Sequence, residues 1–168
     1  LPLDELRAFD TVVIDPERVA LPDLSGTPRT RWFARVTVRA AHWGQHKGQV
    51  DRYVAEHVQP LVQAGYQGLL LDDQGELADS SPDRIRMMTT LVDELATRYP
   101  GLPLLVRNHA DVAEQRAARL SGAVFDSLYH GRRTFGGLMA RVPVKVREAG
   151  LARARQLQEQ HGLTVVAI

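Results

Sequence analysis

The segment GLLLDD, residues 68–73, constrains the fold of this chain more than any other stretch. Its apolar residues run without alternation, which is typical of a strand covered on both faces, as in the parallel sheets of α/β proteins. The strand signal ends abruptly in Asp72 and Asp73, and Glu76 follows shortly after them. These carboxylates have two interpretations: they cap and solubilise a strand end, or they are functional groups that a buried strand holds in place.

The rest of the chain repeats an order of short β-type segments and longer amphipathic segments. Strands are predicted over 11–16, 31–40, 68–73, 103–108, 122–128 and 164–168, and helices over 50–65, 82–98, 110–119 and 147–161. The stretch that follows the predicted strand 122–128, up to about residue 142, is rich in Gly and Arg and predicts no clear element. This order indicates the α/β class with a parallel sheet. Two layouts fit, an open doubly wound sheet or a (β/α)8 TIM-barrel-like fold of which about six strands are visible.

Composition excludes several classes of function. Lys plus Arg total 21 and Asp plus Glu total 20, so the chain lacks the basic excess of a nucleic-acid-binding protein. It has no cysteine, which excludes disulfides and thiolate metal sites. No apolar run approaches the roughly 20 residues of a membrane span, and the segment GRRTFGG (131–137) lacks the Lys-Ser/Thr of a phosphate loop. We therefore predict no nucleic-acid partner, no membrane span, no metal and no cofactor.

Chemistry in parallel α/β folds gathers at the carboxyl ends of the strands. The predicted strands deliver these side chains to that edge: Asp15, Arg39, His42, Trp43, Asp72, Asp73, Arg107, Asn108, His109, Asp126, Ser127, Tyr129 and His130. Carboxylates on separate strand ends, with amides and aromatic rings around them, are typical of a sugar-cleaving site, because glycoside hydrolysis needs two carboxyl groups facing each other across the scissile bond.

Each of these residues also has a purely structural interpretation. Asp72 and Asp73 fit strand-end caps, and Asp15 before a proline fits a turn. The histidines and the tryptophan fit ordinary capping, surface or interior positions. The arginines of the predicted second strand fit a salt-bridged strand face as well as an anion site.

Six short segments together carry a resemblance to a known family. They are ELRAFDTVVIDPERV, ARVTVRA, VQPLVQAGYQGLLLDD, YPGLPLLVRNHADV, GAVFDSLYHG and HGLTVVAI. In this order they resemble the helix and strand units of glycoside hydrolase family 114, the endo-α-1,4-polygalactosaminidases, a family that includes Pel exopolysaccharide hydrolases. The resemblance spans almost the whole chain, although each motif is short.

The resemblance implies a (β/α)8 barrel that acts on a polysaccharide containing galactosamine or N-acetylgalactosamine. It implies catalytic roles for Asp72, which matches the family's strand-end Asp, and for Asp126, which falls on the Glu of an F-E-S-L pattern. The substrate-binding candidates are Asp73, Arg107, Asn108, Tyr129, Trp43 and Arg39.

The candidate site departs from the family pattern in several places, so we expect an altered active site. The second Asp of an L-D-T-x-D pattern falls on Gly75, and the Gly and Glu of a Y-V-S-V-G-E pattern fall on Arg39 and Ala40. Asp126 is one methylene shorter than the family's Glu, a difference of about 1–1.5 Å, and positioning errors of that size cost on the order of 100-fold in rate.

Two hypotheses follow, a glycoside hydrolase and a catalytically impaired pseudo-glycosidase that binds polysaccharide or a partner subunit. An open cleft between Asp72 and Asp126 favours hydrolysis, whereas salt bridges from Arg35 and Arg39 that fill the cleft favour binding. An α/β enzyme of another class, located in the cytoplasm, also stays open.

The resemblance also implies where the protein works and with what. It predicts an extracytoplasmic location, periplasmic or secreted, and partners among the proteins that assemble exopolysaccharide. We expect a single domain over residues 1–168, with one further barrel strand before Leu1 and one after Ile168.

Overall fold

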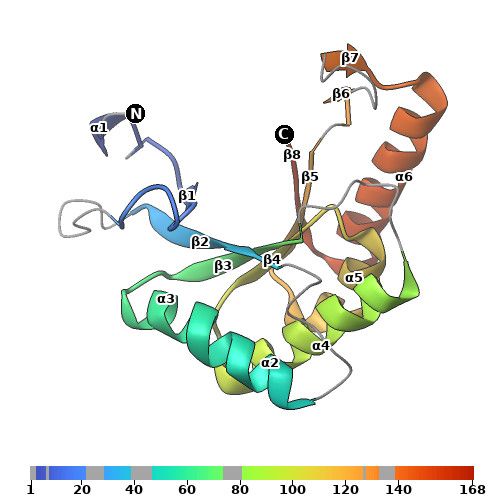
Figure 1. Cartoon of the computed structure of the whole chain (residues 1–168). Helices are drawn as coiled ribbons and strands as arrows, with labels where there is room; N and C mark the ends of the chain where they lie inside the picture. The colour runs from blue at the N-terminus through green and yellow to red at the C-terminus, as the bar shows by residue number, and fades with distance from the viewer. Residues whose placement is uncertain are drawn as a thin grey trace.

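The computed structural model of this chain describes residues 3–6, 8–21, 29–38, 47–73, 81–126, 128–132 and 139–168. Six parallel strands form one sheet, in the order β1 (Thr11–Ile14), β2 (Arg31–Thr37), β3 (Gly68–Asp72), β4 (Leu104–Arg107), β5 (Gly122–Phe125) and β8 (Thr164–Ala167). β6 (His130–Arg132) and β7 (Met139–Arg141) form a separate antiparallel pair. The large sheet is curled, and helices cover its convex face (Figure 1).

The topology distinguishes the two predicted layouts. Neighbouring strands of the large sheet follow chain order from β1 to β5, and β8 continues the series at the far edge. A doubly wound sheet reverses its strand order at a switch point, so that layout is excluded. The curled parallel sheet with helices on one face is an incomplete (β/α) barrel, which confirms the predicted fold class.

The helices agree with the predicted amphipathic segments. Their bounds are α1 (Leu3–Leu6), α2 (Lys47–Tyr53), the π-helix η3 (Val54–Val58), α3 (Gln59–Gln63), α4 (Pro82–Arg98), α5 (Ala110–Gln115), the 3₁₀ turn η4 (Ala117–Arg119) and α6 (Val144–His161). The elements α2, η3 and α3 are continuous, and the wider turn of η3 precedes Pro60, which has no N–H to donate to the helix. Among the described helices, none combines the length and the apolar character required to cross a membrane.

The core lies between the convex face of the sheet and the helices. Alternate residues of each strand point to opposite faces, so Leu69 and Leu71 of β3 are fully buried in this core while Leu70 and Asp72 face the concave side. The helices contribute Val54 and Leu91, which are also fully buried there, to the same core. Apolar packing on the helix side therefore holds the strands, and it leaves the concave side available for polar groups.

Two features differ from the sequence prediction. The β6–β7 hairpin lies in the stretch that predicted no element, because its Gly- and Arg-rich sequence shows no alternation. The pair Ser81 and Pro82 in the sequence predicts an N-cap and a first turn for α4, and Ser81 stands at that N-cap, but its side chain makes no hydrogen bond to the first turn of the helix. The prediction of one domain over residues 1–168 stays a prediction.

The contact between β5 and β8 leaves no room for a side chain at Gly122. A Cβ atom there would lie 2.4 Å from the backbone carbonyl oxygen of Thr164, which cannot move unless β8 shifts. We expect Gly122→Ala to lower the free energy of unfolding by about 1–3 kcal/mol. Gly48 in α2 has no atom within 4 Å of the corresponding position, so Gly48→Ala is expected to leave stability unchanged or to raise it. Urea unfolding of both variants tests this, and equal stabilities would contradict it.

Candidate functional site

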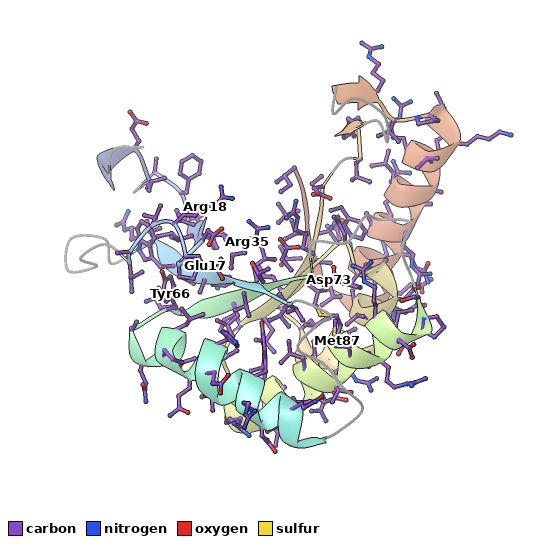
Figure 2. The ribbon with its side chains drawn as sticks, in the orientation of Figure 1. Glu17, Arg18, Arg35, Tyr66, Asp73 and Met87 are labelled. Atoms are coloured by element: carbon purple, nitrogen blue, oxygen red, sulfur yellow. The ribbon has the colours of Figure 1, made fainter. Side chains whose placement is uncertain are left out.

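Five charged side chains, one from each of five neighbouring strands, lie on the concave side at the carboxyl edge of the sheet. They are Asp15 after β1, Arg35 in β2, Asp72 at the end of β3, Arg107 at the end of β4 and Asp126 after β5. Figure 2 shows Arg35 on the open side of the sheet, away from the helices. The charges alternate in sign from strand to strand, and we call this series the charge ladder.

Ion pairs join every neighbouring pair in the ladder. Arg35 Nη1 lies 3.4 Å from Asp15 Oδ2, and Arg35 Nε and Nη2 lie 2.7 and 2.6 Å from Asp72 Oδ2. Arg107 Nη1 lies 2.6 Å from the same Asp72 oxygen, and Arg107 Nη2 donates a hydrogen bond to Asp126 Oδ2. Each arginine therefore bridges two carboxylates that belong to the strands on either side of it.

Asp72 is the centre of the ladder and its most buried member. Its side chain is 3% exposed, whereas those of the other four members are 19–25% exposed. An ion at such a depth needs opposite charges in direct contact, and two guanidiniums on one oxygen meet that need. Burial acts to lower the pKa of Arg107, but the hydrogen bond with Asp126 and the charge of Asp72 outweigh it and raise that pKa above its usual value.

Asp126 is held by a second residue, Asn108. The Asn108 side-chain amide donates to Asp126 Oδ1, and the Asp126 backbone N–H donates to the Asn108 side-chain oxygen at 3.0 Å. With Arg107 on Oδ2, both carboxylate oxygens of Asp126 accept a hydrogen bond from the protein. Asn108 has a backbone φ of 57°, in the left-handed region that asparagine tolerates better than most residues.

Asp73 lies on the other face of the sheet from Asp72. Arg84 of α4 approaches it with Nε at 2.8 Å and Nη2 at 2.5 Å from Oδ2, and His109 Nε2 lies 2.7 Å from the same oxygen. The histidine contact is short but lacks the alignment of a hydrogen bond. The Asp73 and His109 side chains are buried, so this cluster joins β3 to the start of α4 and α5. Its place between sheet and helices separates Asp73 from the concave edge, where a substrate would bind.

The remaining predicted site residues fall in different positions. Tyr129 is 53% exposed and follows the ladder end at Asp126. Trp43 and Arg39 lie outside the described residues, as do Gly75 and Ala40. Within the described ranges, no group of three His, Asp or Glu side chains is arranged to hold a metal ion.

Sequence reasoning foresaw one of the two arginines that contact Asp72 and Asp73 from outside the predicted site, and it missed the other. Arg35 was considered as a strand-face residue, an anion site or a source of salt bridges in the cleft, and it forms ion pairs with Asp15 and Asp72. Its position two residues before Thr37, the register partner of Asp72, places it on the same face as that carboxylate. Arg84 had no such signal, because its contact with Asp73 depends on how α4 packs against β3.

Comparison with solved structures gives the fold a close counterpart. The glycoside hydrolase domain of PelA from Pseudomonas aeruginosa matches with a TM-score of 0.79 and 20% identity, over 99% of this chain and 79% of that chain. A glutamate-to-alanine variant of that domain gives the same values. A family 18 chitinase from Crocus vernus matches at a TM-score of only 0.47 and 12% identity, over 86% of this chain and 67% of that chain, which carries no argument.

Sequence comparison adds no family assignment to this structural likeness. No protein-family model and no curated protein matches the chain. At 20% identity the structural likeness establishes the fold alone. This chain therefore has the fold of a glycoside hydrolase domain. The structural likeness does not extend to the chemistry of the charge ladder.

The central position of Asp72 makes a prediction about stability. We expect Asp72→Asn to lower the free energy of unfolding by about 2–3 kcal/mol, because both arginines would lose their shared buried charge. Asp93 is a matched control, since it also pairs with two arginines, Arg116 and Arg119, but is 37% exposed. Asp93→Asn is expected to cost less than about 1 kcal/mol. Urea unfolding at low and at high salt measures both losses of stability. The prediction is contradicted if Asp72→Asn and Asp93→Asn lose the same free energy of unfolding and if salt reduces both losses equally.

Tyr66 makes a prediction about pH. Burial, and to a smaller extent the charge of Asp15, raise the pKa of its hydroxyl above the usual value. The unfolded chain then releases this proton first, so stability falls as the pH rises above about 10. The hydroxyl is buried without a hydrogen-bond partner among the described residues, so Tyr66→Phe is expected to keep or raise stability at pH 7 and to reduce the alkaline loss. Unfolding curves at pH 7 and 10.5 that lose equal stability in both proteins would disprove it.

Proposed function

We propose that this domain binds a galactosamine-containing polysaccharide at the charge ladder and does not hydrolyse it. The observation that carries the proposal is the position of Arg107, whose single guanidinium contacts both Asp72 and Asp126. In a glycosidase, the two carboxyl groups face each other across the scissile bond, with the sugar between them. Here an arginine bridges the two groups that would have to perform this reaction.

The depth of Asp72 supports the same conclusion. A sugar could touch this carboxylate only after Arg35 and Arg107 had moved away, and the buried charge of Asp72 would then lose both of these ion pairs, at a cost of several kcal/mol. The side chains of Arg35, Arg107 and Asp126 are partly exposed, at 24, 25 and 21%. They can exchange hydrogen bonds with sugar hydroxyls, and the exposed Tyr129 ring offers an apolar surface for a sugar face.

The ligand class rests on the family resemblance and on the charge of the ladder. The six segments resemble family 114, and the fold is that of the PelA glycoside hydrolase domain. The ladder contains three carboxylates and two guanidiniums, and Arg18 pairs with Asp15 at the β1 end, so Asp126 is the carboxylate at the opposite end of the series. The partly exposed Asp126 carboxylate complements the ammonium groups of a partly deacetylated galactosamine polymer.

Hydrolysis of the same polymer is the second candidate. It is favoured by the convergence of Asp72 and Asp126 on one guanidinium, which keeps the two carboxyl groups near each other. Asp72 and Asp126 would then be the two catalytic carboxyl groups. Once Arg107 had moved, a separation near 5–5.5 Å would retain the sugar configuration, and about 6.5–9.5 Å would invert it.

The cellular location and the protein partners follow from the proposed polysaccharide ligand. A protein that binds exopolysaccharide meets it outside the cytoplasm, so we propose a periplasmic or secreted location. Its protein partners would then be those that assemble the same polysaccharide. Both proposals depend on the ligand class and are wrong if the ligand is not such a polysaccharide.

Binding and cleavage are tested together with a partly deacetylated galactosamine polymer. We expect calorimetry to show binding by the natural protein, and mass spectrometry to show no released oligosaccharide. Asp126→Asn is expected to weaken binding about tenfold, because it removes the exposed carboxylate of the ladder. Arg153→Ala is the control, since Arg153 pairs with Asp111 and Glu114 on the helix side, and it should bind as the natural protein does.

Two other outcomes are informative. Oligosaccharides that are released by the natural protein and disappear in Asp72→Asn and Asp126→Asn would overturn the binding proposal and establish the hydrolase. If the natural protein neither binds the polymer nor releases oligosaccharides, both candidate functions are wrong.

A further inference from the structure

Asn108 combines two unusual properties. It is the single asparagine of the chain, and among the described residues it is the one non-glycine residue with a positive φ, at 57°. Left-handed backbone is costly for residues with a side chain, and it persists where the surrounding structure compensates for it. Such a residue at the carboxyl end of a barrel strand stands where these folds place their functional groups.

The contacts of Asn108 indicate what compensates for the strain. Its backbone N–H donates to the Val124 carbonyl oxygen at 2.8 Å, which continues the pairing of β4 with β5. Its side-chain amide then bonds twice to Asp126, once to the carboxylate and once to the backbone N–H. Both polar atoms of the amide are therefore engaged by the same residue, and they restrain both the backbone and the carboxylate of Asp126.

We propose that Asn108 is a positioning residue, which acts through Asp126 and does not itself hold the sugar. This inference deepens the proposed function and rests on it for the meaning of Asp126. The left-handed turn directs the Asn108 amide back toward β5, and the amide fixes the carboxylate in the orientation that also meets Arg107. Asp126 follows the last residue of β5, so the pairing of that strand no longer restrains its side chain. Asn108 supplies the missing restraint.

A simpler role is the alternative. Asparagine adopts left-handed backbone more readily than most residues, so Asn108 could serve the turn alone. The two roles make different predictions for Asn108→Gly, because glycine adopts the same backbone without strain but has no amide. If only the turn matters, glycine replaces asparagine without loss.

The first experiment reads the amide directly. Protein labelled with ¹⁵N only in asparagine shows one side-chain amide signal, because the chain has one asparagine. We expect its two protons to be widely separated in chemical shift, since one of them is bonded to a carboxylate. The separation should shrink in Asp126→Ala, which keeps Asn108 as the single asparagine. An unchanged signal in that variant would overturn the proposal.

The second experiment measures the consequence for binding. We expect Asn108→Gly to bind the galactosamine polymer about tenfold more weakly than the natural protein, while its Tm stays within about 5 °C because relief of strain offsets the lost hydrogen bonds. Gln67→Ala is the matched control. It removes a comparable bond, from the Trp32 backbone N–H to the Gln67 side-chain oxygen at 3.1 Å, at the amino edge of the sheet. This control should keep full affinity.

The outcomes separate this inference from the function on which it rests. Asn108→Gly that binds as tightly as the natural protein would overturn the positioning role, as would equal weakening by Gln67→Ala. If the natural protein does not bind the polymer, the proposed function fails, and the amide signal still decides whether Asn108 restrains Asp126.

Discussion

A single buried carboxylate, Asp72, organises the carboxyl edge of this sheet. Its strand is held from the helix side by Leu69 and Leu71, so the carboxylate cannot move toward solvent without disturbing the core. A carboxylate at this depth is tolerated only beside opposite charge, because its lost hydration is worth several kcal/mol. Arg35 and Arg107 supply that charge from the strands on either side. Each arginine has further donors to satisfy, and Asp15 and Asp126 accept them.

The same contacts are the support for the proposal of binding over cleavage. A catalytic carboxyl group has to exchange a proton or form a bond with the substrate, so at least one of its oxygens must be reachable. Asp72 shares one oxygen between two guanidiniums at 3% exposure, and both oxygens of Asp126 accept protein hydrogen bonds. These contacts stabilise the ionised carboxylates and restrain them. The contacts that make the ladder stable therefore favour the proposed binding role over hydrolysis.

The fold was largely predictable from sequence, and the details of the site were predictable only in part. The repeated order of β-type and amphipathic segments predicted a parallel sheet, and a parallel sheet brings the ends of β3, β4 and β5 to one edge. The apolar strand GLLLDD, however, has no alternation from which to read its faces, so Asp72 and Asp73 were both assigned to the site. In the structure, Asp73 contacts Arg84 and His109 on the helix side of the sheet. Contacts of this kind depend on packing between distant segments, which no local pattern records.

The differences from the family pattern form a consistent set when the ladder is considered as a whole. Arg35, which falls on the Tyr of the Y-V-S-V-G-E pattern that its segment resembles, brings a second cation to Asp72, and the shorter arm of Asp126 lies within reach of both Arg107 and Asn108. Both of these changes, which lie among the described residues, add contacts that satisfy a charge. Proteins can exchange activity for stability in this way, since active sites hold strained or incompletely paired groups at a cost in stability. A sheet edge whose charges satisfy one another presents fixed donors and acceptors, and fixed donors and acceptors are what a sugar-binding surface requires.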